Sequence, residues 1–297
     1  MIGSGYAETV GVFAVIIASV LWGTTGTAAS FAQDLSPLAI GAFAMGVAAL
    51  LLGLRSARPL VRRREALIAK PLLLVSGGLA VAIYPLAFYT SMHLAGVAVG
   101  TVVSLASAPL FAALLERFLS NKAITRSWLS SFVIGVIGIV MLYAGKLSST
   151  SIQGNAPVLG VLLGLIAGLT YAGYTWVVKA HIQAGIESSV SMAALFLFAS
   201  ILLLPSLLIT GDNLFASTLN TSVVVYMAAV PMFLGYIAFG YGLRTVSASS
   251  ATLITLLEPV VAVLLAISVL GEQFALVGWL GLGAIFISLL IQLRAET

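Results

Sequence analysis

Long apolar runs separated by short polar breaks dominate the pattern of the chain. Ten of these runs reach or approach the roughly 20 residues that a helix needs to cross a hydrocarbon core of about 30 Å. Their approximate bounds are 10–30, 37–54, 72–92, 96–115, 127–145, 157–178, 189–209, 222–242, 248–270 and 275–293. The pattern therefore predicts an all-α integral membrane protein with ten transmembrane helices.

Composition supports this prediction and limits the chemistry. Hydrophobic residues make up 61% of the 297 residues and charged residues 7%, whereas soluble domains carry about 25% charged residues. The first run is predicted to be a membrane helix and not a cleaved signal peptide, because Glu8, and no Lys or Arg, precedes it. Cysteine is absent and the two histidines, His93 and His181, lie far apart. We therefore expect no catalytic residues, no metal site and no cofactor.

Basic residues divide unevenly between the two sets of loops that ten spans create. One set contains twelve of the 13 Lys and Arg residues, namely Arg55, Arg58, Arg62, Arg63, Arg64, Lys70, Arg117, Lys122, Arg126, Lys179, Arg244 and Arg294. The other set contains Lys146. Because cytoplasmic loops retain Lys and Arg, we expect both termini in the cytoplasm and a bacterial-type inner (plasma) membrane. The basic run 58–70 is interpreted as a topology determinant in preference to a lipid- or RNA-binding patch, and no nucleic-acid partner is expected.

The second half of the chain repeats the first. APLFAALLERFLSNKAITRSW at 108–128 matches EPVVAVLLAISVLGEQFALVGW at 258–279. In each copy a proline precedes an aliphatic run, a polar turn and a tryptophan (Trp128, Trp279). The unit contains five spans, which predicts repeats over residues 1–147 and 148–297 within one membrane domain. Because five is odd, the second copy must be inverted in the membrane, as in transporters that work by alternating access.

Prolines at matching places in the two halves mark the helices that we expect to kink. Pro85 in the third span corresponds to Pro231 in the eighth, and Pro109 in the fourth corresponds to Pro259 in the ninth. Proline removes an intrahelical hydrogen bond, and a carbonyl freed inside a bilayer must face protein or a water-filled cavity. We therefore predict that these four prolines kink and gate the helices around a central substrate site.

These features resemble the EamA family of the drug/metabolite transporter superfamily. The resemblance is carried by the two matching segments, by the Trp-Gly pair at Trp22, and by the spacing from Pro259 to Gly271 and Glu272. The first repeat departs from this pattern, with Ser-Asn-Lys at 120–122 in place of Gly-Glu. The resemblance implies ten helices around a central cavity and export of small metabolites. The placement of aromatic residues is similar to that of YddG-type exporters of aromatic amino acids.

Glu258 stands inside an apolar run, next to Pro259. An acidic residue at a membrane helix centre costs roughly 2.5–3.5 kcal/mol, so it should face the bundle interior, take up a proton or pair with a partner. We predict that Glu258 lines the cavity and either binds an amino group of the substrate or accepts a proton. The alternative is a structural role, in which a protonated glutamate bonds to a carbonyl freed by Pro259.

Aromatic residues supply the other candidate groups. Several fall near the centres of their spans and not at the interface, where such residues usually anchor. A hydrated cavity with aromatic faces suits a flat apolar substrate or a cation, and plain helix packing is the alternative. We expect Trp128, Trp176 and Trp279 to anchor at the membrane surface. The predicted substrate-binding residues, with the hydroxyl residues as secondary candidates, are Trp22, Tyr84, Tyr89, Ser104, Ser107, Tyr171, Tyr236, Thr255 and Glu258.

Several functions remain open beside amino-acid export. The chain contains no HExxH, GxGD or GxSxG motif, which argues against a membrane enzyme, and inverted halves argue against a channel. An exporter of drugs or aromatic cations remains, as does an uncoupled facilitator or importer of the same fold. We expect a monomer in the bilayer, a small-molecule substrate and protons as a candidate second ligand. Glycines at 160, 164 and 168 are expected to pack helices within one chain.

Overall fold

The computed structural model of the protein describes residues 2–145, 156–271, 273 and 275–296. These residues form helices joined by short turns, and no strand occurs among them. The helices are α1 (Ile2–Gly23), α2 (Thr25–Ser30), α3 (Pro37–Arg55), α4 (Ala57–Ile68), α5 (Pro71–Ala95), α6 (Val97–Leu119), α7 (Arg126–Ala144), α8 (Pro157–Gln183), α9 (Ser188–Thr210), α10 (Thr218–Met227), the π-helix η1 (Ala228–Leu234), α11 (Gly235–Gly242), α12 (Ala248–Ile254), α13 (Leu257–Leu270) and α14 (Leu276–Glu296).

Ten spans within the described residues are long and apolar enough to cross a membrane, which confirms the predicted number. They are Tyr6–Ser30, Pro37–Arg55, Pro71–Ala95, Val99–Leu119, Arg126–Ala144, Pro157–Gln183, Ser188–Thr210, Thr218–Gly242, Ala248–Leu270 and Leu276–Arg294. Three spans are composite: α1 with α2, α10 with η1 and α11, and α12 with α13. The basic run between the second and third spans forms an additional helix, α4, which the hydropathy pattern did not predict.

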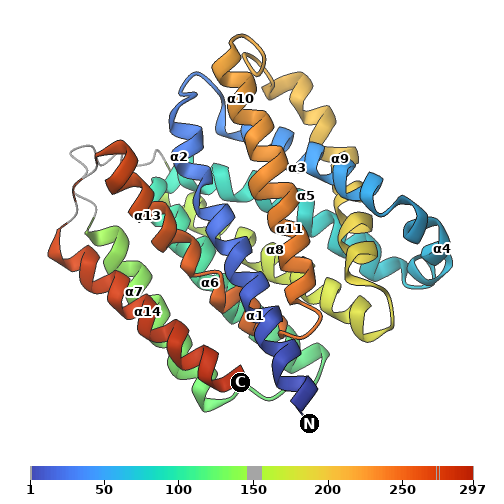
Figure 1. Ribbon diagram of the computed structural model, residues 1–297. Helices are drawn as coiled ribbons and strands as arrows, with labels where there is room; N and C mark the ends of the chain where they lie inside the picture. The colour runs from blue at the N-terminus through green and yellow to red at the C-terminus, as the bar shows by residue number, and fades with distance from the viewer. Residues whose placement is uncertain (1, 146–155, 272, 274, 297) are drawn as a thin grey trace.

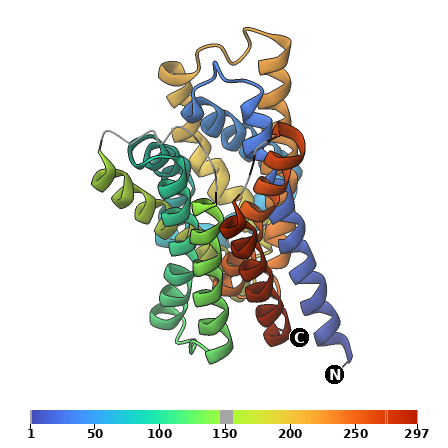
Figure 2. The ribbon, with the colours of Figure 1, turned by 90° about the vertical axis from the view of Figure 1, so that its left-hand side faces the viewer.

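The two five-helix halves pack against each other symmetrically, so that the main helix pairs between them have equivalent pairs in which the two repeats swap roles. Helix α5 packs on α8, and its counterpart pair is α1 on α11; likewise α6 on α8 corresponds to α13 on α1. Two further pairs, α3 with α9 and α7 with α14, join equivalent helices of the two halves. Figures 1 and 2 both show α7 and α14 side by side, and in Figure 1 they form one edge of the molecule. This pairing is the arrangement that a five-helix repeat used twice predicts.

Local sequence explains many of the helix ends. Helices α3, α5 and α8 begin at Pro37, Pro71 and Pro157, where the missing proline N–H has no helical partner to lose. Helix α13 ends at Gly271, whose φ of +70° lies in the left-handed region that glycine adopts without strain. That geometry accounts for the glycine of the family's Gly-Glu pair, whereas Glu272 lies outside the described residues.

The four prolines occupy different local structures in the two halves, and their roles in kinking and gating stay predictions. Helices α5 and α6 continue without a break through Pro85 and Pro109. In the second half, Pro231 lies in the π-helix η1, and Pro259 lies in the first turn of α13, just after the break between α12 and α13. The first span also breaks, at Thr24, without any proline. Interruptions therefore concentrate in the first, eighth and ninth spans.

The start of α1 and the end of α14 lie at the same end of the molecule, called here the N-terminal face (Figure 1). Alternation of ten spans places the twelve basic residues on this face as well. Lys146, the expected exception, lies outside the described residues. Glycines 160, 164 and 168 of α8 face α5 and α6 so closely that an added Cβ would lie within 3 Å of Ala95, Ser91 and Ser107, which confirms packing within one chain.

Candidate functional site

A cavity opens between the two halves, inside the membrane-spanning part of the protein. Its empty space, including the portion that is open to solvent, amounts to about 590 Å³. Residues from α1, α2, α3, α5, α8, α10, η1, α11 and α13 line it: Trp22, Thr25, Gly41, Ala44, Met45, Tyr84, Pro85, Phe88, Tyr89, Tyr171, Tyr174, Met227, Met232, Tyr236 and Glu258.

Glu258 reaches this cavity because of the break between α12 and α13. It is the second residue of α13, and its backbone N–H closes the turn by donating to the Thr255 carbonyl at 2.9 Å. The side chain is half-buried, and no other side chain or backbone group among the described residues hydrogen-bonds or ion-pairs with its carboxylate. The described part of the cavity wall therefore presents one carboxylate without a protein partner.

Seven aromatic residues line the cavity around Glu258, namely Trp22, Tyr84, Phe88, Tyr89, Tyr171, Tyr174 and Tyr236. The Trp22 ring lies 4.9 Å from that of Tyr236 and 5.1 Å from that of Phe239, centroid to centroid. The Tyr84 and Tyr171 rings are 5.5 Å apart. Such tilted contacts hold the rings rigidly, because each pair stabilises the packing by about 0.5–1.5 kcal/mol beyond burial. These seven aromatic residues are called here the aromatic box, and Glu258 forms its acidic corner.

Several hydroxyl groups of the cavity wall and of the residues behind it hydrogen-bond to one another. Tyr171 donates from its hydroxyl to Thr255 Oγ1 at 3.0 Å, and Thr255 donates to the Thr252 carbonyl at 2.8 Å. The hydroxyls of Tyr174 and Tyr236 are 3.2 Å apart. By contrast, the indole N–H of Trp22 is buried without a hydrogen-bond partner among the described residues. This nitrogen lies against α11, because a Cβ added to Gly235 would stand 2.7 Å from it.

The structure brings most of the predicted site residues together. Trp22, Tyr84, Tyr89, Tyr171, Tyr236 and Glu258 all line the cavity, with Thr255 directly behind Tyr171. Ser104 and Ser107 are not among its described lining residues; they donate to the carbonyls of Gly100 and Ser104 in their own helix, which is the usual behaviour of hydroxyls in membrane helices. Of the four prolines, Pro85 lines the cavity.

Sequence reasoning missed several lining residues. Phe88 and Tyr174 occupy helices that already supplied candidates, one turn beyond Tyr84 and three residues beyond Tyr171. Helical spacing could have found them, because residues i, i+3 and i+4 share a face. Met45, Met227 and Met232 could not be distinguished from ordinary apolar residues. Trp128, expected at the membrane surface, is buried and stacks on Phe132 with ring centroids 5.2 Å apart.

The Trp-Gly pair of the first span has a clear structural role. Trp22 lies in the last turn of α1 and contributes its ring to the cavity, while Gly23 lies against the start of α13. A Cβ at Gly23 would stand 2.8 Å from the Glu258 carbonyl oxygen and 2.6 Å from the Val261 Cβ. Only glycine lets the two broken helices approach this closely.

Replacing Gly23 with alanine is therefore expected to displace the turn that carries Glu258 and to impair transport. Overpacking of this kind costs about 1–3 kcal/mol. The matched control is Gly26→Ala in α2, where nothing lies within 4 Å of an added Cβ. Transport in proteoliposomes and thermal stability of both variants check the prediction. Equal transport by Gly23→Ala and Gly26→Ala would contradict it.

Fold and site together define a class: multi-pass membrane transporters with two five-helix repeats around a central cavity. The chain belongs to the EamA-like transporter family, whose model matches residues 9–144 and again residues 158–294. This double match confirms the family that the sequence resembles and its two-repeat organisation. The family consists of transporters and not enzymes.

Individual relatives agree with this assignment. The chain is 33% identical over 280 residues to "Uncharacterized transporter YwfM" of Bacillus subtilis, covering 93% of this chain and 91% of the relative. It is 30% identical over 192 residues to "Uncharacterized inner membrane transporter YedA" of Escherichia coli K12, covering 64% of this chain and 60% of that protein. A solved crystal structure superposes with a TM-score of 0.78 over 95% of both chains at 15% identity, which supports the fold.

Proposed function

We propose that this transporter exports neutral amino acids, aromatic ones first, from the cytoplasm across a bacterial inner membrane by alternating access. The repeats at residues 1–147 and 148–297 would rock or bend around the cavity, and both termini would lie in the cytoplasm. The basic N-terminal face supports this orientation. Inner-membrane location is supported by the relative YedA, which is named an inner membrane transporter.

The unpartnered carboxylate of Glu258 inside the aromatic box is the observation that carries the proposal. A charged group without a partner in such a site is costly, so a ligand that brings a positive charge gains more there than at any exposed carboxylate. An ammonium group meets that requirement, and the surrounding rings favour both a cation and a flat apolar side chain. The hydroxyls of Tyr84 and Tyr89 in the cavity wall would donate to the substrate carboxylate.

A second candidate, export of aromatic monocations, rests on a different observation. No Lys, Arg or His is among the described residues that line the cavity. A zwitterionic amino acid would therefore find only uncharged donors for its carboxylate, whereas a monocation needs none. The ligands of the two candidate functions therefore differ in the carboxylate, which an amino acid has and a monocation lacks.

A direct test compares L-phenylalanine with phenethylamine, which lacks only the carboxylate. The purified protein is reconstituted in liposomes, and labelled uptake is measured with and without a pH gradient. We expect saturable flux of phenylalanine at least about tenfold above that of phenethylamine, because a buried donor without its acceptor penalises the truncated ligand. The reverse order would replace the amino-acid assignment with aromatic cations. Flux that requires the gradient would make Glu258 the proton-coupling residue.

A further inference from the structure

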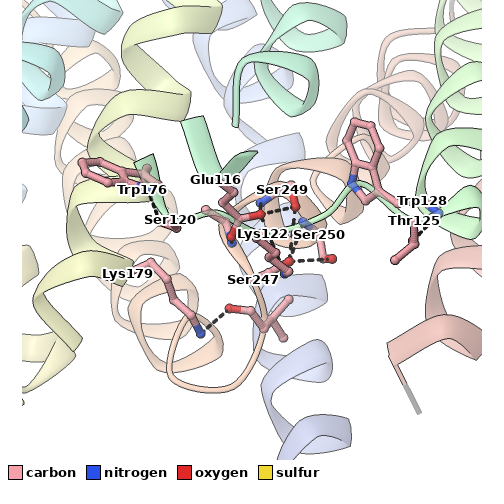
Figure 3. A network of polar contacts seen from close by, with 12 residues as sticks. Glu116, Ser120, Lys122, Thr125, Trp128, Trp176, Lys179, Ser247, Ser249 and Ser250 are labelled. Carbon is pink, nitrogen blue, oxygen red and sulfur yellow. Dashed lines mark hydrogen bonds and ion pairs between the residues drawn. The ribbon is translucent and has the colours of Figure 1, made fainter. Parts of the chain in front are cut away.

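Opposite charges hold the turn between α11 and α12 at the N-terminal face. From one side, Lys179 of α8 donates from Nζ to the carbonyls of Leu243 and Val246, each at 2.8 Å. From the other side, Glu116 of α6 accepts from the backbone N–H groups of Ala248, at 3.0 Å, and Ser249, at 3.3 Å. Figure 3 shows both side chains converging on this turn.

The signs of these charges match the backbone groups that they meet. The carbonyls of Leu243 and Val246, between α11 and α12, and the first N–H groups of α12 have no backbone partners among the described residues, and they carry partial negative and positive charge, respectively. Glu116 also accepts a hydrogen bond from the Ser249 hydroxyl, and its side chain is only 5% exposed. A buried carboxylate from the first half thus caps a helix of the second half.

This turn joins two elements of the cavity wall. Helix α11 carries Tyr236, and α12 leads through the break at Thr255 to Glu258. Movement of the turn would therefore be transmitted to the aromatic wall and to the acidic corner of the site. Two interrupted spans, the eighth and the ninth, meet at this turn.

We propose that residues 243–250 form the gate at the N-terminal face, and that Glu116 and Lys179 are the positioning residues that hold it closed. The inference rests on the proposed alternating-access transport and adds the contacts that one half of the cycle must break. Lys122 supplies an alternative partner for the released carboxylate, because its Nζ is already 3.8 Å from Glu116 Oε2 and its side chain is 49% exposed. Glu116 would thus exchange one charged partner for another instead of losing all of them.

The absence of cysteine in the chain allows single reporters on each side of the gate. Ala113 is buried in the pocket beside Glu116, Lys122 and Ser249. Thr25 lines the cavity at the start of α2, which lies away from the N-terminal face (Figure 1). Ala113→Cys and Thr25→Cys are each combined with Glu116→Gln and, separately, with Lys179→Gln. The rate of maleimide labelling is then measured in nanodiscs without substrate. Glu65→Gln, an exposed carboxylate in α4 on the same face, is the matched control.

We expect Glu116→Gln to speed labelling at position 113 and to slow it at position 25, each by about tenfold, because losing charged hydrogen bonds of one state shifts a two-state equilibrium to the other. Lys179→Gln should shift both rates in the same directions, and Glu65→Gln neither. Faster labelling at both positions would show general loosening and overturn the gate, as would unchanged rates. The readout needs no substrate, so the gate stands or falls independently of whether amino acids are transported.

Discussion

Replacing Glu258 with glutamine is expected to abolish saturable transport while leaving the protein folded. Glutamine has nearly the same shape but cannot supply the negative charge that an ammonium group would meet in the cavity. Removing one partner of a desolvated charge pair costs about 2–5 kcal/mol, which corresponds to at least about a 30-fold loss of affinity. Concentration-dependent uptake of phenylalanine in proteoliposomes measures the effect. Glu258→Asp, which keeps the charge on a shorter side chain, should retain part of the activity.

Two comparisons separate this site effect from a structural one. Glu65→Gln removes an exposed carboxylate from α4 and should transport like the unmodified protein. If Glu258 instead stabilised the break before Pro259 as a protonated group, glutamine would replace it well. Glu258→Gln would then transport at an unchanged rate across pH 5.5–8.5, and that outcome would contradict the assigned role.

Hydropathy and internal repetition predicted much of this molecule because both follow from the bilayer. A membrane span must be a continuous apolar helix, so the length of each apolar run predicts the length of the helix. The same constraint identifies Glu258 as a candidate site residue, because a carboxylate in an apolar span is energetically costly. The aromatic candidates were predicted from their position near the centres of the membrane spans alone. Six of the predicted substrate-binding residues line one cavity.

The features that escaped prediction depend on contacts between distant parts of the chain. Glu116 stands beside Arg117 and near Lys122, which is the pattern of a polar turn at the end of a span. Its burial arises because α12, more than 130 residues later, presents two backbone N–H groups to it. The break at Thr24 has no proline that would predict it, and it lies beside Gly23, which packs closely against the start of α13.

The two halves are equivalent in packing but not in the continuity of their helices. Helices α5 and α6 pass through their prolines intact, whereas the second half carries the π-helix and the break before Pro259. A π-helical segment leaves a helix easily deformed and often marks a functional site. We therefore expect the eighth and ninth spans to bend during transport, while α5 and α6 move as rigid elements.

Replacing Trp22 with alanine should reduce transport strongly, because Trp22 connects the two interrupted regions of the cavity wall. Its ring contacts Tyr236 and Phe239 of α11, and an added Cβ on Gly235 would lie 2.7 Å from the indole nitrogen. Losing one aromatic contact with a substrate ring, worth about 0.5–1.5 kcal/mol, predicts up to roughly a tenfold weaker apparent affinity. Trp22→Phe keeps an aromatic face and should recover most of it. Substrate titration in proteoliposomes measures the series.

Trp279 provides the matched control, because it is a tryptophan of a membrane helix that lies outside the site. Its side chain is 47% exposed in α14 and does not line the cavity. Trp279→Ala removes the same number of atoms, so any general effect of deleting a tryptophan will appear in both variants. If Trp22 served only helix packing, Trp22→Ala would lower thermal stability without changing the apparent affinity. A shift in affinity confined to position 22 would instead identify its ring as part of the substrate-binding surface.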